Sequence, residues 1–326
     1  MKHRQANTCA SSPNLRGTGG LLLLAAMLCG IFLPAGGRVA ASSFAPRIDS
    51  KKVEELIRES GAETVAIAFY DLATNEQFYV EPDKSFHAAS TMKIAVMMEV
   101  YRKAVAGKIS FSDRVPVKND FISIADGSHY SITAESDSDQ SLYSKIGQTE
   151  TIRELVRLMI DVSSNLATNI LIERVNAPRV MELMQEVGAK NIRVLRGVED
   201  SKAYERGLNN TTTARDLLIL LRLMAERRAV SGKASDEMIK VLLDQKFNEG
   251  IPAGLPAEVR VAHKTGSITG INHDAAIVYL PNRKPYVLVI LTRGIEDEKR
   301  AHKLIADISR TVYESLTSAQ QVNQSK

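Results

Sequence analysis

The chain has 326 residues, of which 44% are hydrophobic and 25% are charged, a composition typical of a globular protein with a substantial core. It carries 42 basic and 38 acidic residues, which gives a net charge of +4. Four of the basic residues lie in the first 41 residues, so the rest of the chain is near neutral. No nucleic-acid partner is therefore expected. Both cysteines, Cys9 and Cys29, lie in the same segment, which excludes disulfides, cysteine–zinc sites and a cysteine nucleophile from the rest of the chain.

Residues 1–41 have the pattern of a secretory signal peptide. A basic start is followed by the apolar run LLLLAAMLCGIFL at 21–33 and by small residues before Ser42. The run is short for a bilayer span, which needs about 20 residues. An uncleaved membrane anchor is the alternative. Cleavage predicts a periplasmic or secreted protein with no stable membrane anchor.

The first half of the remaining chain predicts a helix, a hairpin, a second helix and a long loop. Residues 51–61 are amphipathic and end at Gly61, and residues 64–82 predict a β-hairpin with its turn at 73–76. An apolar helix is expected from Ser90 to about Val105. Residues 116–148 are polar and irregular, which favours a long loop or lid.

The second half predicts helices followed by strands. Residues 149–185 are helical in two or three pieces, and residues 186–211 form a second extended loop. The other expected elements are helices at 211–227, 234–245 and 296–317, and strands at 259–268, 272–280 and 285–294.

This order of elements predicts an α+β fold in which a five-stranded antiparallel sheet, flanked by helices, is built from both ends of the chain and an all-helical domain is inserted between them. Residues 42–84 together with 232–317 are expected to form the α/β domain. Residues 85–231 are expected to form the helical domain. Residues 318–326 are polar and are expected to be a loose tail.

Ser90 and Lys93 stand three residues apart where the apolar helix is expected to begin. Positions i and i+3 share one face of a helix, so the two side chains are predicted neighbours. A serine becomes a nucleophile when a base removes its proton, and a lysine serves as that base only when burial or a nearby cation lowers its pKa. The apolar residues 94–98 would provide that burial. Taken alone, the same pair also fits an ordinary helix start with a serine cap.

Two further segments carry residues that could take part in catalysis or substrate binding. Lys264, Thr265, Gly266 and Ser267 end a predicted strand, where a glycine often marks the close approach of a ligand or another backbone. The lysine would be the second cation, and the backbone N–H of Ser267 would be an oxyanion donor. The alternative is a simple strand end with a turn.

The second segment, residues 163–165, reads Ser-Ser-Asn between two predicted helices. Ser163 could relay a proton to a leaving nitrogen, and Asn165 could bind a substrate carbonyl and brace Lys93. A simple helix cap is the alternative.

The three motifs S-x-x-K, S-x-N and K-T-G occur in this order, at a helix start, between helices and on a strand. In this respect the chain resembles the serine β-lactamase and penicillin-binding protein superfamily, and most closely the class A β-lactamases. The resemblance covers roughly residues 50–315. It includes the segments TIREL at 151–155, TTTARDL at 211–217 and HDAAIVYLP at 273–281.

The resemblance implies a β-lactamase/D,D-peptidase-like fold with the site between its two domains. It implies that Ser90 is acylated with help from Lys93, that Ser163 shuttles the proton and that Asn165 holds the acyl side chain. It also implies a segment that receives the substrate carboxylate, namely Lys264, Thr265, Gly266 and Ser267. Three distant segments would then converge so that one hydroxyl lies within hydrogen-bond reach of both lysines.

The sequence departs from the class A pattern at two places. The middle motif reads Ser-Ser-Asn, where class A enzymes usually have Ser-Asp-Asn. The loop that carries the deacylating glutamate in class A enzymes has an arginine, an aromatic residue and then Glu-Pro. Here an ungapped match puts Val198 at the catalytic position and Glu199 one residue late. Glu199 either reaches the site through a backbone shift or is a solvated loop carboxylate.

The resulting prediction is a secreted serine hydrolase, a β-lactamase working through an acyl-enzyme on Ser90, with a β-lactam or acyl-D-Ala-D-Ala-like substrate. The alternatives are a penicillin-binding D,D-peptidase or esterase, and a binding module that does not turn β-lactams over. No cofactor or metal is expected, because the histidines are not spaced as a ligand set. A monomer is expected. Tyr130 or Tyr143 is a candidate for the pocket wall, and nothing in the sequence chooses between them.

Overall fold

The structure, a computed structural model, describes residues 48–324, with side chains up to residue 318. The signal peptide predicted at 1–41 lies outside these residues. No helix within 48–324 is long and apolar enough to cross a membrane.

A five-stranded antiparallel sheet confirms the fold class predicted from the element order. Its strands are β1 (Thr64–Asp71), β2 (Gln77–Val80), β9 (Arg260–Ile268), β10 (Ile271–Tyr279) and β11 (Tyr286–Arg293). They lie in the order β2-β1-β11-β10-β9. The N-terminal hairpin thus joins the three C-terminal strands through β1 and β11, which pair from Thr64 opposite Arg293. Strand β9 forms an edge of the sheet, and it carries residues 264–267.

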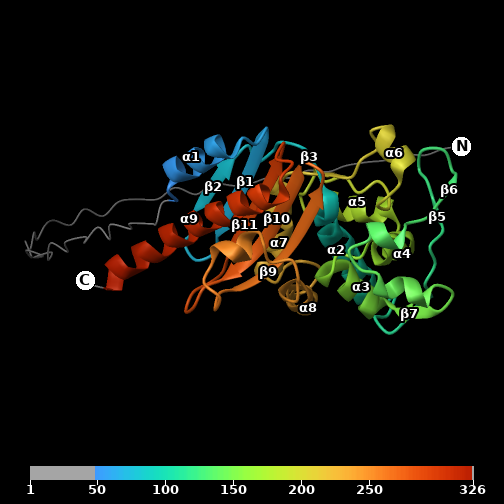
Figure 1. Cartoon of the computed structure of the whole chain (residues 1–326). Helices are drawn as coiled ribbons and strands as arrows, with labels where there is room; N and C mark the ends of the chain where they lie inside the picture. Colours follow the sequence, from blue (N-terminus) through green and yellow to red (C-terminus); the bar gives the residue numbers. More distant parts are fainter. Residues whose placement is uncertain (1–47, 325–326) are drawn as a thin grey trace, which may run out of the picture. The chain divides into compact units, whose positions relative to one another are not determined.

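Helices cover both faces of the sheet. Helices α1 (Ser50–Ser60) and α9 (Glu298–Gln324) pack together over one face (Figure 1). Helix α7 (Ala214–Ala225) contacts β1, β10 and β11. The alternation of side chains along β1 explains both contacts. Val65, Ile67 and Phe69 belong to the core shared with α1 and α9, whereas Ala66 and Ala68 belong to the core shared with α7.

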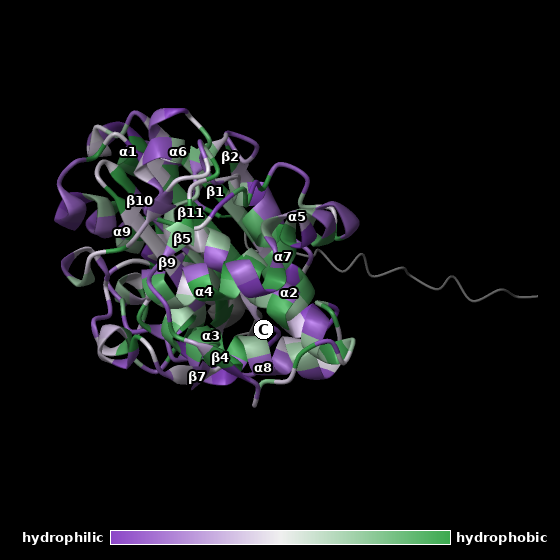
Figure 2. Cartoon of the chain, turned by 90° about the vertical axis from the view of Figure 1, so that its right-hand side faces the viewer, coloured by the Kyte–Doolittle hydropathy of each residue, from purple (hydrophilic) through white to green (hydrophobic). Residues whose placement is uncertain are grey.

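The helical part centres on α2 (Lys93–Val105), whose residues 93–101 are all buried. A helix that is apolar around its whole circumference is expected to be a core helix. Figure 2 shows the hydrophobic colour along α2. The helices around it are α3 (Ile152–Asp161), α4 (Asn165–Val175), α5 (Ala177–Glu186) and α8 (Gly232–Leu243). The helical pattern expected in two or three pieces between 149 and 185 is confirmed, and it forms three helices, α3, α4 and α5.

The two regions predicted as long loops contain short elements. The first, 116–148, lies between the paired strands β4 and β7 and holds the pair β5–β6 and two 3₁₀ turns, and the second holds α6 (Ser201–Glu205) and leads into β8. The short strands are β3 (Phe86–His87), β4 (Arg114–Pro116), β5 (Phe121–Ile122), β6 (His129–Tyr130), β7 (Thr149–Thr151) and β8 (Thr211–Thr212). Asp200 links the two regions, because it accepts hydrogen bonds from Ser123 Oγ at 2.8 Å and from Ile124 N at 3.1 Å.

The predicted loose tail at 318–326 is wrong for residues 318–324, because α9 continues to Gln324. This segment contains alanine and glutamine, which favour helix, and lacks the glycine or proline that would end one. The division into an α/β domain at 42–84 plus 232–317 and a helical domain at 85–231 stays a prediction. Residues of the sheet and of the central helices belong to one continuous core.

Candidate active site

Ser90 lies in a 3₁₀ turn, Ala89–Met92, and not in the first turn of the α-helix as the sequence predicted. Helix α2 begins at Lys93. The reason is local, because Ala89 has a φ of 44° and Thr91 N donates to Ala88 O at 3.0 Å, which closes a tighter turn. Ser90 and Lys93 still lie within one turn of backbone.

Strand β9 runs against the backbone of this turn at Gly266. A Cβ atom at position 266 would lie 2.9 Å from Ser90 N and 3.0 Å from Thr91 N. Only glycine therefore permits this approach without a backbone shift, which is the role expected of a glycine on a strand. The contact brings Ser90 next to Thr265 and Ser267 on the sheet edge.

The Lys93 side chain is completely buried and reaches the turn between α3 and α4. Its Nζ donates to Ser163 O at 2.6 Å, to Ser163 Oγ at 3.1 Å and to Asn165 Oδ1 at 2.9 Å. Burial lowers the pKa of Lys93 to about 7, against the opposing effects of Asp137 and Glu199. An amine with a pKa near 7 suits a general base at neutral pH.

Lys264 approaches the same serine from the sheet. It is fully buried, and its Nζ donates to Ser163 Oγ at 3.0 Å and to Thr265 O at 2.9 Å. Burial, together with the nearby Lys93 ammonium, lowers the pKa of Lys264 well below its usual value. Because the two ammonium groups repel each other across Ser163, the loss of a proton from one favours its retention by the other.

The hydroxyl that lies within hydrogen-bond reach of both lysines is that of Ser163. Within residues 48–324 the Ser90 hydroxyl makes no hydrogen bond, and it faces the cleft. Ser163 has a φ of 58°, a left-handed backbone that is uncommon outside glycine. This conformation turns both Ser163 oxygens toward the lysines. The adjacent Ser164, not Ser163, caps α4 by accepting from Ala167 N at 3.3 Å.

Glu199 lies in the same cleft as Ser90. Its Oε1 accepts a hydrogen bond from Asn165 Nδ2 at 3.3 Å, and its side chain is exposed. Val198, the residue before Glu199, is held by Asn169 on both of its backbone groups. Asn169 Oδ1 accepts from Val198 N at 2.7 Å, and Asn169 Nδ2 donates to Val198 O at 3.0 Å. Glu199 itself has a φ of 60°. The left-handed turn after the anchored Val198 is the backbone shift that brings the carboxylate into the cleft.

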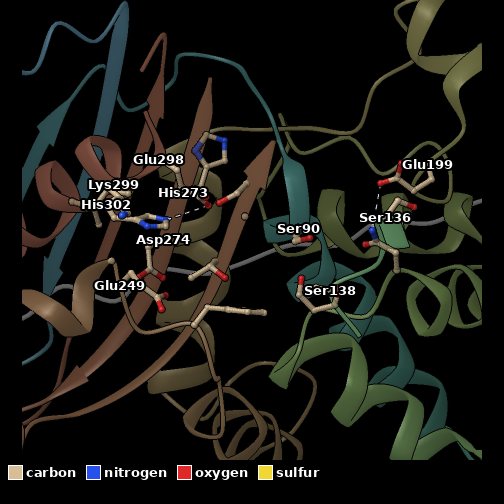
Figure 3. Close-up of a pocket in the computed structure, with 18 residues that line it drawn as sticks. Ser90, Ser136, Ser138, Glu199, Glu249, His273, Asp274, Glu298, Lys299 and His302 are labelled. Carbon is tan, nitrogen blue, oxygen red and sulfur yellow. Dashed lines mark hydrogen bonds and ion pairs between the residues drawn. The ribbon is translucent and has the colours of Figure 1, made fainter. Parts of the chain in front are cut away.

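The cleft has a volume of about 500 Å³ and runs between the sheet edge and the helical part. Figure 3 shows Ser90 between Glu199 and Ser136 on one side and His273 and Asp274 on the other. The lining includes Ser90, Ser163, Asn165, Glu199, Thr265, Gly266 and Ser267. A second hollow of about 340 Å³ adjoins it and shares Ser90, Asn165, Glu199 and Ser267.

Neither tyrosine proposed for the pocket wall lines these two hollows. Tyr143 donates to Asp137 Oδ2 at 2.9 Å, and Tyr130 donates to Val198 O at 3.3 Å. Tyr143 thus holds the segment around Asp137 and Tyr130 the segment around Val198, and both segments border the cleft. The aromatic ring that does line the second hollow belongs to Tyr204, whose side chain is exposed, and the sequence carried no signal for it.

Two residues at the site escaped the sequence analysis. Asp137 accepts from the backbone N–H groups of Asn165 and Leu166, both at 2.8 Å, and Asn169 anchors Val198. The stretch Asp-Ser-Asp at 137–139 was visible as a polar cluster, but nothing in it pointed to a helix 28 residues away. Among residues 48–324 no group of three or more histidine, cysteine or acidic side chains could hold a metal ion.

Comparisons with known proteins agree with this arrangement. The model of the family described as "Beta-lactamase enzyme family" matches residues 50–316. The β-lactamases of Streptomyces albus G and Bacillus licheniformis are each 27% identical. The first match covers 93% of this chain and 96% of that protein, and the second covers 76% and 77%.

Two solved structures are also similar. PBP-A is 25% identical with a TM-score of 0.72, over 83% of this chain and 98% of its own. An acyl-enzyme complex of a PBP-A variant with penicillin G is 26% identical with a TM-score of 0.72, over 82% and 96%. The family match spans most of the chain and includes every residue of the site, so the chain belongs to the β-lactamase enzyme family. It has the β-lactamase fold, and it is a class A β-lactamase-like hydrolase.

Proposed function

We propose that the chain is a serine hydrolase that opens β-lactam rings through an acyl-enzyme on Ser90. The observation that carries the proposal is that residues 90, 163 and 265–267 line one cleft, beside the buried side chains of Lys93 and Lys264. The proposal includes export through the predicted segment 1–41. A penicillin acyl-enzyme is described for the PBP-A variant, which supports the same intermediate here.

The proposed acylation uses these groups in the following order. Neutral Lys93 removes the Ser90 proton, and Ser90 Oγ forms a bond to the lactam carbonyl carbon. The backbone N–H groups of Ser90 and Ser267 stabilise the negative oxygen that develops. The ring C–N bond then breaks, and Ser163 donates its hydroxyl proton to the leaving nitrogen and regains one from a lysine ammonium.

The remaining residues orient the substrate and complete turnover. Lys264, Thr265 and Ser267 receive the substrate carboxylate, and Asn165 binds the amide of the acyl side chain. Glu199 removes a proton from a water molecule whose oxygen bonds to the ester carbon, the bond from that carbon to Ser90 Oγ breaks, and the proton passes from Glu199 to Ser90 Oγ.

A second candidate function is penicillin binding with slow turnover, as in a D,D-peptidase or a β-lactam sensor. The exposed position of Glu199 and its location after Val198 favour this candidate. Intact-mass spectrometry after mixing with penicillin G, together with turnover of a chromogenic cephalosporin, distinguishes the two. A transient adduct with steady turnover supports the β-lactamase. A stable adduct supports the second candidate, and hydrolysis of acyl-D-Ala-D-Ala identifies a peptidase. Absence of any adduct contradicts the proposal.

The rate of acylation is expected to rise with pH and to level off above about pH 7, the pKa to which burial lowers Lys93. Protonated Lys93 cannot accept the Ser90 proton, so each unit of pH below this pKa costs about tenfold in rate. The second-order rate constant for labelling by a fluorescent penicillin, measured from pH 5 to pH 9, checks this. A profile that is flat below pH 7, or one that is still rising tenfold per pH unit at pH 9, contradicts a base with a lowered pKa.

Gly266→Ala is expected to slow acylation by about 10- to 100-fold, because the new methyl group would displace the backbone of Ser90 from the sheet edge. Gly107→Ala is the matched control. Gly107 has a φ of 68° and no atom within 4 Å of the added Cβ, and it lies outside the cleft lining. It should lose some thermal stability and keep the wild-type labelling rate. Equal labelling rates for the two variants would mean that the close approach at 266 has no catalytic role.

A further inference from the structure

The turn at 163–165 is held from outside by two consecutive residues of the 116–148 loop. Asp137 is only 7% exposed, and its two carboxylate oxygens accept from Asn165 N and Leu166 N, each at 2.8 Å. These N–H groups belong to the first turn of α4, where backbone donors lack partners within the helix. Asp137 therefore caps a helix from a distant segment of the chain, with a charge of the sign that the N-terminus of a helix favours.

The Ser138 hydroxyl contacts the other side of the same turn. Its Oγ is close to Val162 O at 2.7 Å and to Ser163 O at 3.0 Å, so its single proton is shared between two carbonyls. Tyr143 fixes the Asp137 carboxylate by donating to it at 2.9 Å. Together these contacts hold both ends of a turn whose first residue, Ser163, has an unfavourable left-handed backbone.

Lys93 depends on that turn for all three of its hydrogen-bond acceptors, which belong to Ser163 and Asn165. Residue 164, where class A relatives usually carry an aspartate, is a neutral serine that caps only Ala167 N. Its Oγ lies 3.5 Å from Asp137 Oδ2. The carboxylate missing from position 164 is thus replaced by one that arrives from another loop.

We propose that Asp137 is a positioning residue for the reaction, because it supplies from the 116–148 loop the buried carboxylate that holds the 163–165 turn around Lys93. The inference rests on the proposed acylation of Ser90. It extends that function to a residue that does not touch the reacting atoms.

The charge of Asp137 also acts on Lys93. Three charged groups face this lysine from other segments: Asp137 from the 116–148 loop, Glu199 from the 186–211 loop and Lys264 from β9. Lys264 is in turn influenced by Asp161 of α3 and Asp274 of β10. Because Asp137 favours the charged form of Lys93, its removal lowers the Lys93 pKa further and moves the rising part of the acylation profile to lower pH.

Asp137→Asn tests the proposal in the full chain, since it keeps the size of the side chain and removes its charge. We expect acylation above pH 8 to slow about tenfold or more. We expect the rising part of the pH profile to move down by about half a pH unit or more. In hydrogen exchange, residues 163–166 should lose protection. Asp139→Asn is the matched control, because this half-buried carboxylate lies two residues away, accepts hydrogen bonds from Ser141 and makes none with α4 among the described residues.

Tyr143→Phe separates geometry from charge. It removes one donor to Asp137 but keeps the carboxylate, so protection at 163–166 should fall while the pH profile stays in place. A wild-type pH profile, labelling rate and exchange pattern in Asp137→Asn would overturn the proposal. A slower rate with an unmoved profile would overturn it as well, since a merely structural cap would behave in this way. Failure of the wild-type protein to form any adduct is a different outcome, which contradicts the proposed function itself.

Discussion

Replacing Ser90 with alanine is expected to abolish covalent labelling by penicillin G and to reduce any turnover by about 10⁴-fold or more, because the acceptor of the acyl group is gone. The fold should not change. The Ser90 hydroxyl makes no hydrogen bond within residues 48–324, so the free energy of unfolding should change by less than about 0.5 kcal/mol. Intact-mass spectrometry and thermal denaturation measure the two effects.

Ser136→Ala provides the control for this change. Ser136 lines the same cleft, but its hydroxyl contacts Thr133 and none of the residues around the lysines. The control should label at the wild-type rate. An adduct of full mass on Ser90→Ala protein would move the nucleophile to another residue and contradict the assignment.

Replacing Glu199 with glutamine is expected to leave acylation nearly intact and to slow deacylation by about 10²- to 10⁴-fold, the usual contribution of a general base. The carboxylate oxygen faces the cleft beside the Asn165 amide, where it can accept a proton from water. Glutamine cannot accept that proton. The penicillin adduct should therefore persist for much longer than in the wild-type protein.

Glu205→Gln is the control, because Glu205 lies on the short helix that follows in the same loop, is exposed and does not line the cleft. The lifetime of the adduct, followed by mass spectrometry after removal of free penicillin, is the measurement. Equal lifetimes in the wild-type and Glu199→Gln proteins would mean that Glu199 is a solvated carboxylate. The protein would then be a penicillin-binding protein with slow release, as in the second candidate function.

The element pattern of the chain was predictable because it depends on short-range signals. The run of Val, Ile, Phe and Tyr in β1, the Gly270 turn between β9 and β10 and the apolar run of α2 are each contained in about ten residues. The sheet built from both chain ends followed from the order of these elements. The end of α9 was predicted wrongly, because polar composition alone does not end a helix that lacks a stop signal.

The residue types of the site and their order were also visible in the sequence, because each motif carries its chemistry in three or four neighbouring residues. Which atoms meet was decided by the tertiary structure. Contacts of Ser163 with Lys93 and Lys264 join residues 70 and 101 positions apart. The bridging role of Ser163, the entry of Glu199 into the cleft and the cap supplied by Asp137 all depend on backbone turns and packing between such distant segments. These arise from the whole core, so no short window of sequence contains them.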